Sequence, residues 1–157
     1  MKKFTFVKTP CIGVCSTGIG DDVCRGCKRY KHEVIDWNAY AFQQQKVVES
    51  RLANFLSQTV QNYWLIIDET KLRWQLQQQP IEVPWHRDLY CQLYVLVDAG
   101  ASQMKRPGDF GFMVRKRFEN LSLRVMCETI DRDFYALSKA HYACYFEGKH
   151  TQHHSVL

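Results

Sequence analysis

The chain of 157 residues has no long apolar run. Its longest, residues 64–67, is far shorter than the roughly 20 residues that a membrane-spanning helix needs. The first eight residues are basic but contain no apolar stretch of the length found in signal peptides. We therefore expect a cytoplasmic protein that has no membrane partner.

The sequence also lacks the short motifs that mark common enzyme classes. It contains no glycine-rich phosphate loop, nucleophile elbow, H-E-x-x-H helix or paired-carboxylate motif. This absence favours a non-catalytic protein, although it leaves an enzyme open. Proline is scarce, with four residues, and 46% of the chain is hydrophobic. The composition therefore predicts a compact fold rather than a disordered chain.

Cysteine, by contrast, is concentrated in one place. Four of the seven lie in a short segment with the spacing C-x3-C-x8-C-x2-C, namely Cys11, Cys15, Cys24 and Cys27. In a reducing compartment such a group indicates metal binding before disulfide pairing. Four converging thiolates suit one tetrahedral zinc ion or one iron–sulfur cluster. The segment is therefore predicted to be a metal site.

The spacing leaves the identity of the metal open. The two cysteine pairs match the knuckles of structural zinc sites, whereas iron–sulfur proteins often take the fourth cysteine from further along the chain. The remaining cysteines, Cys91, Cys127 and Cys144, lie in apolar segments and are expected to be buried as small hydrophobic residues. An iron–sulfur cluster and zinc both stay open at this point.

Positive charge gathers in the same segment. Residues 1–31 hold seven basic and two acidic side chains, whereas the rest of the chain holds fourteen of each. Arg25, Lys28 and Arg29 lie beside the second cysteine pair. They either compensate the negative charge of metal-bound thiolates or form a docking surface for phosphates or an acidic partner. We give the first interpretation more weight.

The cysteine motifs resemble those of one protein family. The sequence has a Pro-Cys-x3-Cys start at residues 10–15, a Cys-Arg-Gly-Cys-x-Arg knuckle at residues 24–29, and Trp37 before a helix. Over residues 9–56 it resembles domain of unknown function 1289, a family of small bacterial proteins predicted to contain iron–sulfur clusters. The resemblance implies a cysteine-ligated metal centre in a cytoplasmic bacterial protein and carries no established reaction.

The hydrophobic pattern predicts an α+β fold. Apolar residues at three- and four-residue spacing predict a helix over residues 39–61. Alternating residues predict a strand pair over residues 63–67 and 71–76, and a second pair over 110–118 and 121–127. Residues 89–97 fit either a strand or a helix, and we favour a strand. A final helix is expected over residues 134–145, with Gly148 at its end.

This pattern suggests two parts and a tail. Residues 1–62 are expected to form a cysteine-ligated metal module, in which a small four-cysteine knuckle is followed by a long helix. Residues 63–148 are expected to form a mixed strand and helix domain, and residues 149–157 a flexible tail.

A second basic stretch combines cations with aromatic rings. Residues 105–118 contain three phenylalanines and five basic residues, Lys105, Arg106, Arg115, Lys116 and Arg117. Rings and cations together suit single-stranded nucleic acid. An ordinary edge strand that buries its rings and exposes its charges is the stronger alternative.

These observations predict a small metal-binding protein that acts as an interaction module for a protein or RNA partner. Its partner surface would be formed by Arg25, Lys28 and Arg29 together with the five basic residues of the second stretch. The competing hypothesis is a redox or RNA-modifying enzyme that uses an iron–sulfur cluster for electron transfer or sensing.

Overall fold

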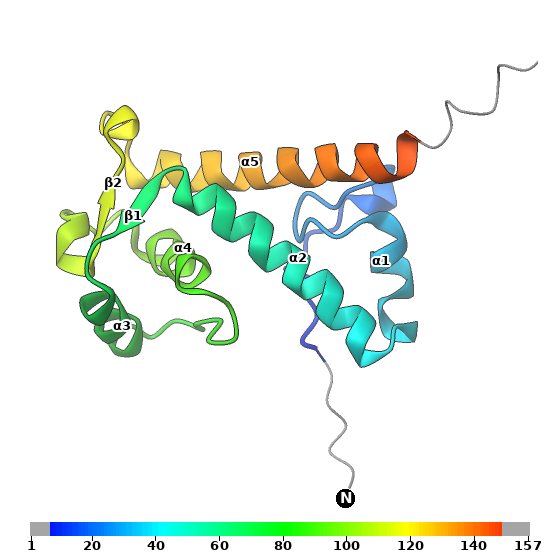
Figure 1. Cartoon of the computed structure of the whole chain (residues 1–157), viewed down its shortest axis with the longest axis horizontal. Helices are drawn as coiled ribbons and strands as arrows, with labels where there is room; N and C mark the ends of the chain where they lie inside the picture. Colours follow the sequence, from blue (N-terminus) through cyan, green and yellow to red (C-terminus); the bar gives the residue numbers. More distant parts are fainter. Residues whose placement is uncertain (1–6, 149–157) are drawn as a thin grey trace, which may run out of the picture. The chain divides into compact units, whose positions relative to one another are not determined.

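The computed structural model describes residues 7–148, which group into two compact units (Figure 1). The first unit takes the described residues up to Leu52 together with those from Phe134 onward, and the second is Ala53–Asp133. The sequence suggested a division after residue 62 instead. The structural boundaries fall inside the two longest helices because each helix contributes residues to both units. The predicted tail, residues 149–157, lies outside the described residues.

The first unit combines the cysteine segment with helical pieces from both ends of the chain. The cysteine segment holds one 3-10 turn, η1, and is followed by a short helix, a second 3-10 turn and the start of a long helix. Its elements are η1 (Thr17–Ile19), α1 (Lys31–Asp36), η2 (Trp37–Ala39), the first half of α2 (Phe42–Gln61), the end of α5 (Leu123–Tyr142) and the π-helical η5 (Ala143–Glu147).

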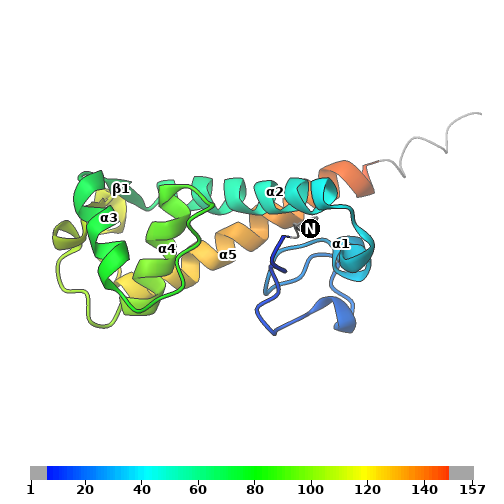
Figure 2. The same ribbon diagram turned by 90° about the horizontal axis from the view of Figure 1, so that it is seen from below.

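The second unit is helical around one small sheet. Its further elements are β1 (Trp64–Ile66), α3 (Glu69–Gln78), α4 (Leu89–Gly100), η3 (Pro107–Phe110), β2 (Phe112–Val114) and η4 (Lys116–Phe118). The two strands are antiparallel, with Leu65 opposite Met113. Helices α3 and α4 lie side by side in both ribbon views (Figure 2). The fold is therefore α+β, as predicted.

Three predicted strands are wrong because their residues form helices. Residues 71–76 lie in α3, where Leu72 and Leu76 are buried four residues apart while Trp74 is exposed. The Asp68 carboxylate accepts the backbone N–H of Lys71 at 2.9 Å and caps this helix. The short alternation of apolar and polar residues was therefore accidental, and the cap decided the local structure.

The same reason applies to α4 and to the start of α5. Residues 89–97 belong to α4, whose N-terminus is capped by the Asp88 carboxylate through the N–H of Cys91 at 2.9 Å. Residues 123–127 open α5, where the Ser122 hydroxyl accepts the N–H of Val125 at 3.2 Å. Each cap accepts a backbone N–H of the first helical turn, which has no partner within the helix. In a strand the same N–H would pair with a neighbouring strand.

The predictions with a longer repeat are confirmed. Helix α2 covers most of residues 39–61, and Val48, Leu52 and Val60 are buried along one face. The helix expected over residues 134–145 forms the second half of α5 and continues into η5, with Gly148 as the C-cap. The strand expected near Phe112 exists, but it pairs with β1. Among the described residues no helix is long and apolar enough to cross a bilayer.

Candidate metal centre

The second cysteine pair lies on a tight backbone turn. Val23 and Tyr30 form an isolated antiparallel bridge, which brings the two ends of the turn together. The N–H of Cys24 donates to the carbonyl of Arg29 at 2.9 Å, and the N–H of Lys28 donates to the carbonyl of Cys24 at 2.8 Å. Lys28 takes the left-handed conformation, with φ of 63°. Both sulfurs are thereby held on the same knuckle.

The sulfur of Cys24 is surrounded by hydrogen-bond donors. Burial by itself disfavours its ionisation, but backbone groups of Cys27, Ser16 and Gly26 and the Cys27 side chain form hydrogen bonds with it. These donors outweigh burial and lower the pKa of the Cys24 thiol to about 7. In its neutral form the thiol donates to the carbonyl of Val14 at 3.6 Å. The site therefore stabilises a thiolate, which is the form that binds metal.

The sulfur of Cys27 is also buried, but its surroundings differ. Burial raises the pKa of this thiol, and the Arg29 side chain opposes that effect. The Arg29 Nε–H donates to the Cys27 sulfur at 3.2 Å. The knuckle thus holds one thiol that ionises near neutral pH and one that has an arginine ready to stabilise its negative charge.

The neighbouring cations are part of the packing around the knuckle. Lys28 and Arg29 are both buried. The Lys28 ammonium lies 5.4 Å from the centre of the Phe134 ring, and the Arg29 guanidinium lies 4.9 Å from that of Trp37. Buried cations beside a cysteine pair fit charge compensation and cannot form a docking surface.

Arg25 has a different position at the same turn. Its side chain is exposed and forms an ion pair with Asp21 at 2.9 Å. Its guanidinium also lies 5.9 Å from the ring of Tyr135. Since Phe134 and Tyr135 belong to α5, the last part of this helix covers one side of the knuckle (Figure 1). Of the three cations beside the knuckle, Arg25 is the one that a partner can reach.

The first cysteine pair lies on an exposed stretch of the segment. The Cys11 sulfur accepts the N–H of Gly13 at 3.4 Å, and the Cys15 sulfur lies 3.1 Å from the Thr17 hydroxyl. Within residues 7–148 no three histidine, cysteine or acidic side chains converge as metal ligands do. The four predicted ligands therefore appear as one assembled pair and one exposed pair.

The stretch that carries the exposed pair packs directly on the knuckle. A Cβ atom on Gly26 would lie 2.3 Å from the carbonyl oxygen of Val14, so only glycine allows this approach. The N–H of Arg25 donates to the Ser16 hydroxyl at 2.9 Å. Val14 and Ser16 flank Cys15 in the sequence. The donor chemistry and this close contact fit a four-thiolate centre, although the first pair has not closed on the second.

The comparison with protein families concerns this segment. Residues 9–55 match the family model described as Protein of unknown function (DUF1289). The match confirms the resemblance and covers all four cysteines. No curated protein and no solved structure matches the chain.

An ion pair between Glu33 and Arg51 stabilises residues 9–55, hereafter the DUF1289 segment. The Glu33 carboxylate accepts the N–H of Tyr30 at 2.9 Å and binds the Arg51 guanidinium through two hydrogen bonds, one of them 2.7 Å long. Arg51 also lies 3.9 Å from the centre of the Tyr30 ring. The Tyr30 hydroxyl is 2.7 Å from Nδ1 of His141. This network anchors the chain where it leaves the knuckle.

This network was not predicted from the sequence, although the sequence contains one signal of it. An acidic residue three positions after a helix N-cap is the pattern of a capping box, and Glu33 follows Tyr30 at that distance. The partner of Glu33 could not be found in the same way, because Arg51 lies 18 positions further along the chain.

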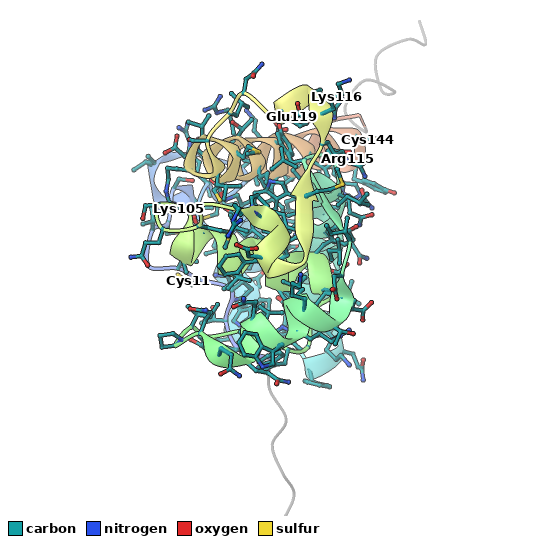
Figure 3. The ribbon with its side chains drawn as sticks, turned by 90° about the vertical axis from the view of Figure 1, so that its left-hand side faces the viewer. Cys11, Lys105, Arg115, Lys116, Glu119 and Cys144 are labelled. Atoms are coloured by element: carbon teal, nitrogen blue, oxygen red, sulfur yellow. The ribbon has the colours of Figure 1, made fainter. Side chains whose placement is uncertain are left out.

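The second basic stretch, outside the DUF1289 segment, does not form one patch. Arg115 and Arg117 donate to the carbonyls of Gln61 and Asn62, at 2.7 and 3.4 Å, and so satisfy acceptors at the end of α2. Arg106 forms an exposed ion pair with Asp109. Lys105 and Lys116 lie at separate places in Figure 3. Neither side chain has a hydrogen-bond or ion-pair partner within the described part of the chain.

Proposed function

We propose that the DUF1289 segment binds a metal centre through the thiolates of Cys11, Cys15, Cys24 and Cys27. The observation that carries this proposal is the knuckle, where hydrogen bonds lower the pKa of Cys24 to about 7 and Arg29 donates to the sulfur of Cys27. A buried thiol without such donors stays protonated and inert. Sulfurs surrounded by donors are typical of metal-thiolate sites, in which such hydrogen bonds stabilise the bound thiolates.

The first pair would complete the centre by a local movement. Cys11 and Cys15 are exposed, and no described side chain other than Thr17 contacts their sulfurs through a hydrogen bond. The contact of Val14 with Gly26 keeps their stretch against the knuckle. Binding of the metal would offset the entropy lost when this stretch becomes ordered around it.

The metal is proposed to be iron in an iron–sulfur cluster, with zinc as the alternative. The iron–sulfur cluster rests on what the sequence resemblance implies, whereas the two knuckle-like pairs support zinc. The description of the matching family model names neither metal. When bound, a cluster supplies one-electron transfer, while zinc supplies a structural cross-link between the two pairs. Both are outcomes of one measurement.

The role that we propose is that of a cytoplasmic bacterial interaction module for a protein or RNA partner. Arg25, Lys105 and Lys116 are exposed cations that support it, Arg25 while it is paired with Asp21. Arg106, Arg115 and Arg117 are exposed too, but Arg106 binds Asp109 and the other two bind backbone carbonyls. A redox or RNA-modifying enzyme is the alternative, and a cluster that accepts electrons would favour it.

The test is elemental analysis of the full chain purified without oxygen. Iron, sulfide and zinc are measured together with the visible spectrum before and after dithionite. We expect one centre per chain. A bleachable absorption band identifies an iron–sulfur cluster and favours the redox alternative, whereas a colourless protein with one zinc identifies a structural site.

Matched variants locate the centre. Cys24→Ser with Cys27→Ser is expected to remove nearly all of the metal, because it deletes the assembled pair. Cys91→Ala with Cys127→Ala changes two buried cysteines of the second unit and is expected to leave the metal content unchanged. Metal that survives the first double variant, or a wild-type chain without metal, would contradict the proposal.

The RNA role has its own variant. Lys105→Ala with Lys116→Ala removes exposed cations without disturbing the carbonyls that Arg115 and Arg117 satisfy. Salt-dependent binding of single-stranded RNA that weakens in this variant supports an RNA partner, and the slope of log affinity against log salt should also become shallower. Absent or salt-independent binding leaves a protein as the proposed partner.

A further inference from the structure

The second unit contains a hollow that the proposed metal centre does not explain. Its volume is about 580 Å³, and all fourteen residues that line it lie between Ile67 and Met126. This volume lies within the range of about 300–1,000 Å³ that is typical of small-molecule sites. The hollow is therefore large enough for a ligand with a substantial apolar body.

The walls of the hollow are mainly apolar from floor to rim. Met104, Phe112 and Met126 are buried and form its deeper part. Ile67, Met113 and Leu121 line it as well and are exposed by 55%, 45% and 38%. Large apolar side chains around a concavity leave surface in water that an apolar ligand would cover.

Methionine is unusually frequent in this lining. Met104, Met113 and Met126 are three of the four methionines of the chain. Methionine is unbranched and flexible, so it adapts to ligands of varied shape. Behind the wall, the indole of Trp64 packs against Phe112 with 5.6 Å between ring centres and donates to the sulfur of Met126 at 3.4 Å. These contacts hold the floor in place.

Two charged residues of opposite sign line the hollow. Lys105 and Glu119 are the two charged residues of the lining, and both are exposed. Neither side chain has a hydrogen-bond or ion-pair partner among the residues described. The other basic residues of the second basic stretch, residues 105–118, do not line the hollow. The Lys105 side chain is therefore the group of the lining that can hold an anion.

Glu119 limits how much negative charge the ligand can carry. Figure 3 places Glu119 and Lys105 at separate points, so that one group can hold the anion while the other faces the rest of the ligand. A second negative charge on the ligand would meet this carboxylate at a cost. From the apolar lining, the free lysine and the single acid, we infer that the hollow binds an amphipathic monocarboxylate, with its carboxylate at Lys105 and its apolar body against the three methionines.

The test uses the full chain and titration calorimetry with decanoate below its micelle concentration. The ligands for comparison are 1-decanol, which is neutral, decylammonium, which is positive, and decanedioate, which carries two carboxylates. We expect decanoate to bind most tightly. The Cε methyl signals of Met104, Met113 and Met126, observed by ¹³C-methyl NMR, should shift as it binds.

Two exposed lysines form a matched pair of variants. Lys105→Ala should lower the affinity for decanoate about tenfold, because it removes a charge-assisted hydrogen bond. It should leave the affinity for decanol unchanged. Lys116→Ala changes an exposed lysine that does not line the hollow and should leave the affinities for decanoate and decanol unchanged. Glu119→Gln should reduce the difference in affinity between decanoate and decanedioate, because it removes the carboxylate that repels a second negative charge. Both lysines are at the surface, so circular dichroism should show folded variants.

Several results would overturn the inference. If decanoate gives no heat of binding and shifts no methionine methyl signal, the hollow does not bind a monocarboxylate. Equal affinity for the acid, the alcohol and the amine, unchanged in Lys105→Ala, reduces the hollow to an apolar surface without a carboxylate site. A concentration-dependent dimer in sedimentation that Met113→Asp dissociates assigns the hollow to a second copy of the chain.

Discussion

Two buried cysteines, Cys24 in the first unit and Cys127 in the second, have pKa values shifted in opposite directions. In the first unit, hydrogen bonds lower the pKa of buried Cys24 to about 7, whereas in the second unit burial raises the pKa of Cys127 to about 12. Both thiols are almost fully inaccessible to solvent. Burial alone therefore does not decide whether a cysteine is inert. The number of donors that face the sulfur decides it.

The units also differ in their ion pairs. The Glu33–Arg51 pair of the first unit has side chains that are 6% and 16% exposed, whereas the Glu69–Arg73 pair of α3 has side chains that are 61% and 52% exposed. The first pair supports the chain behind the knuckle, and the second lies on a helix surface. A Glu–Arg pair therefore matters for stability where it is buried, because loss of one partner leaves an uncompensated charge, and contributes little where it is exposed.

The largest expected effect comes from breaking the buried pair. Arg51→Ala leaves the Glu33 carboxylate buried without its cation, and we expect a loss of about 3–5 kcal/mol in the free energy of unfolding. Arg73→Ala, the exposed counterpart, should cost about 0–1 kcal/mol. Chemical denaturation measures both, and hydrogen exchange should place the loss in the amides of α1. Equal losses in the two variants would remove the distinction between the pairs.

A smaller effect is expected from Gly26→Ala. The new Cβ would lie 2.3 Å from the carbonyl oxygen of Val14 and would push the first cysteine pair away from the knuckle. We expect a loss of about 1–3 kcal/mol in stability, together with weaker metal retention.

Gly18→Ala is the matched control for this change. It lies in the same segment, with no atom within 4 Å of its new Cβ and no positive φ, so its effect should stay within about 0.5 kcal/mol. Full metal retention in Gly26→Ala would show that the contact with Val14 does not position the cysteines.

The smallest effect is a difference in pH dependence. Cys127 has a folded pKa of about 12 against an ordinary value of 9.0, so its contribution to stability is complete below pH 9 and is lost as the pH rises toward 12. The loss is up to about 1.4 kcal/mol per pH unit. Cys24 has the opposite sign: in the metal-free protein its contribution is present above pH 9 and is lost as the pH falls through 7.

Urea unfolding at several pH values between 7 and 11 measures this difference. Cys127→Ala should flatten the fall in stability above pH 9, and Cys144→Ala, which changes an exposed cysteine, should not. If stability falls equally steeply above pH 9 in Cys127→Ala, the burial of this thiol does not cause the fall. Tyr63 also contributes at alkaline pH, since burial and its hydrogen bond to Asp133 raise its pKa to about 12. Tyr63→Phe separates its contribution from that of Cys127.

Sequence patterns predicted the long elements better than the short ones. A repeat sustained over twenty residues, as in α2, has few alternative explanations, and that prediction is confirmed. Residues 71–76 alternate apolar and polar side chains over only six positions, and residues 89–97 are a short apolar stretch that fits a strand or a helix. The deciding features were Asp68 and Asp88, which cap α3 and α4. An acidic residue shortly before each stretch is therefore the sequence feature that predicts a helix at both places.

The basic residues illustrate what sequence cannot separate. Counting charges grouped Arg25, Lys28 and Arg29 together, but the structure exposes the first and buries the other two. It likewise uses Arg115 and Arg117 to bind carbonyls at the end of α2, more than fifty positions earlier in the chain. A count of charges contains no information about such partners.

By itself, the sequence determined which side chains are available for metal binding and where α2 runs, because both depend on neighbouring residues. Only the tertiary structure decided which thiol ionises near pH 7, which cations are buried, and that Glu33 pairs with Arg51. These outcomes depend on burial and on donors from distant segments, and such contacts exist only once the chain has folded.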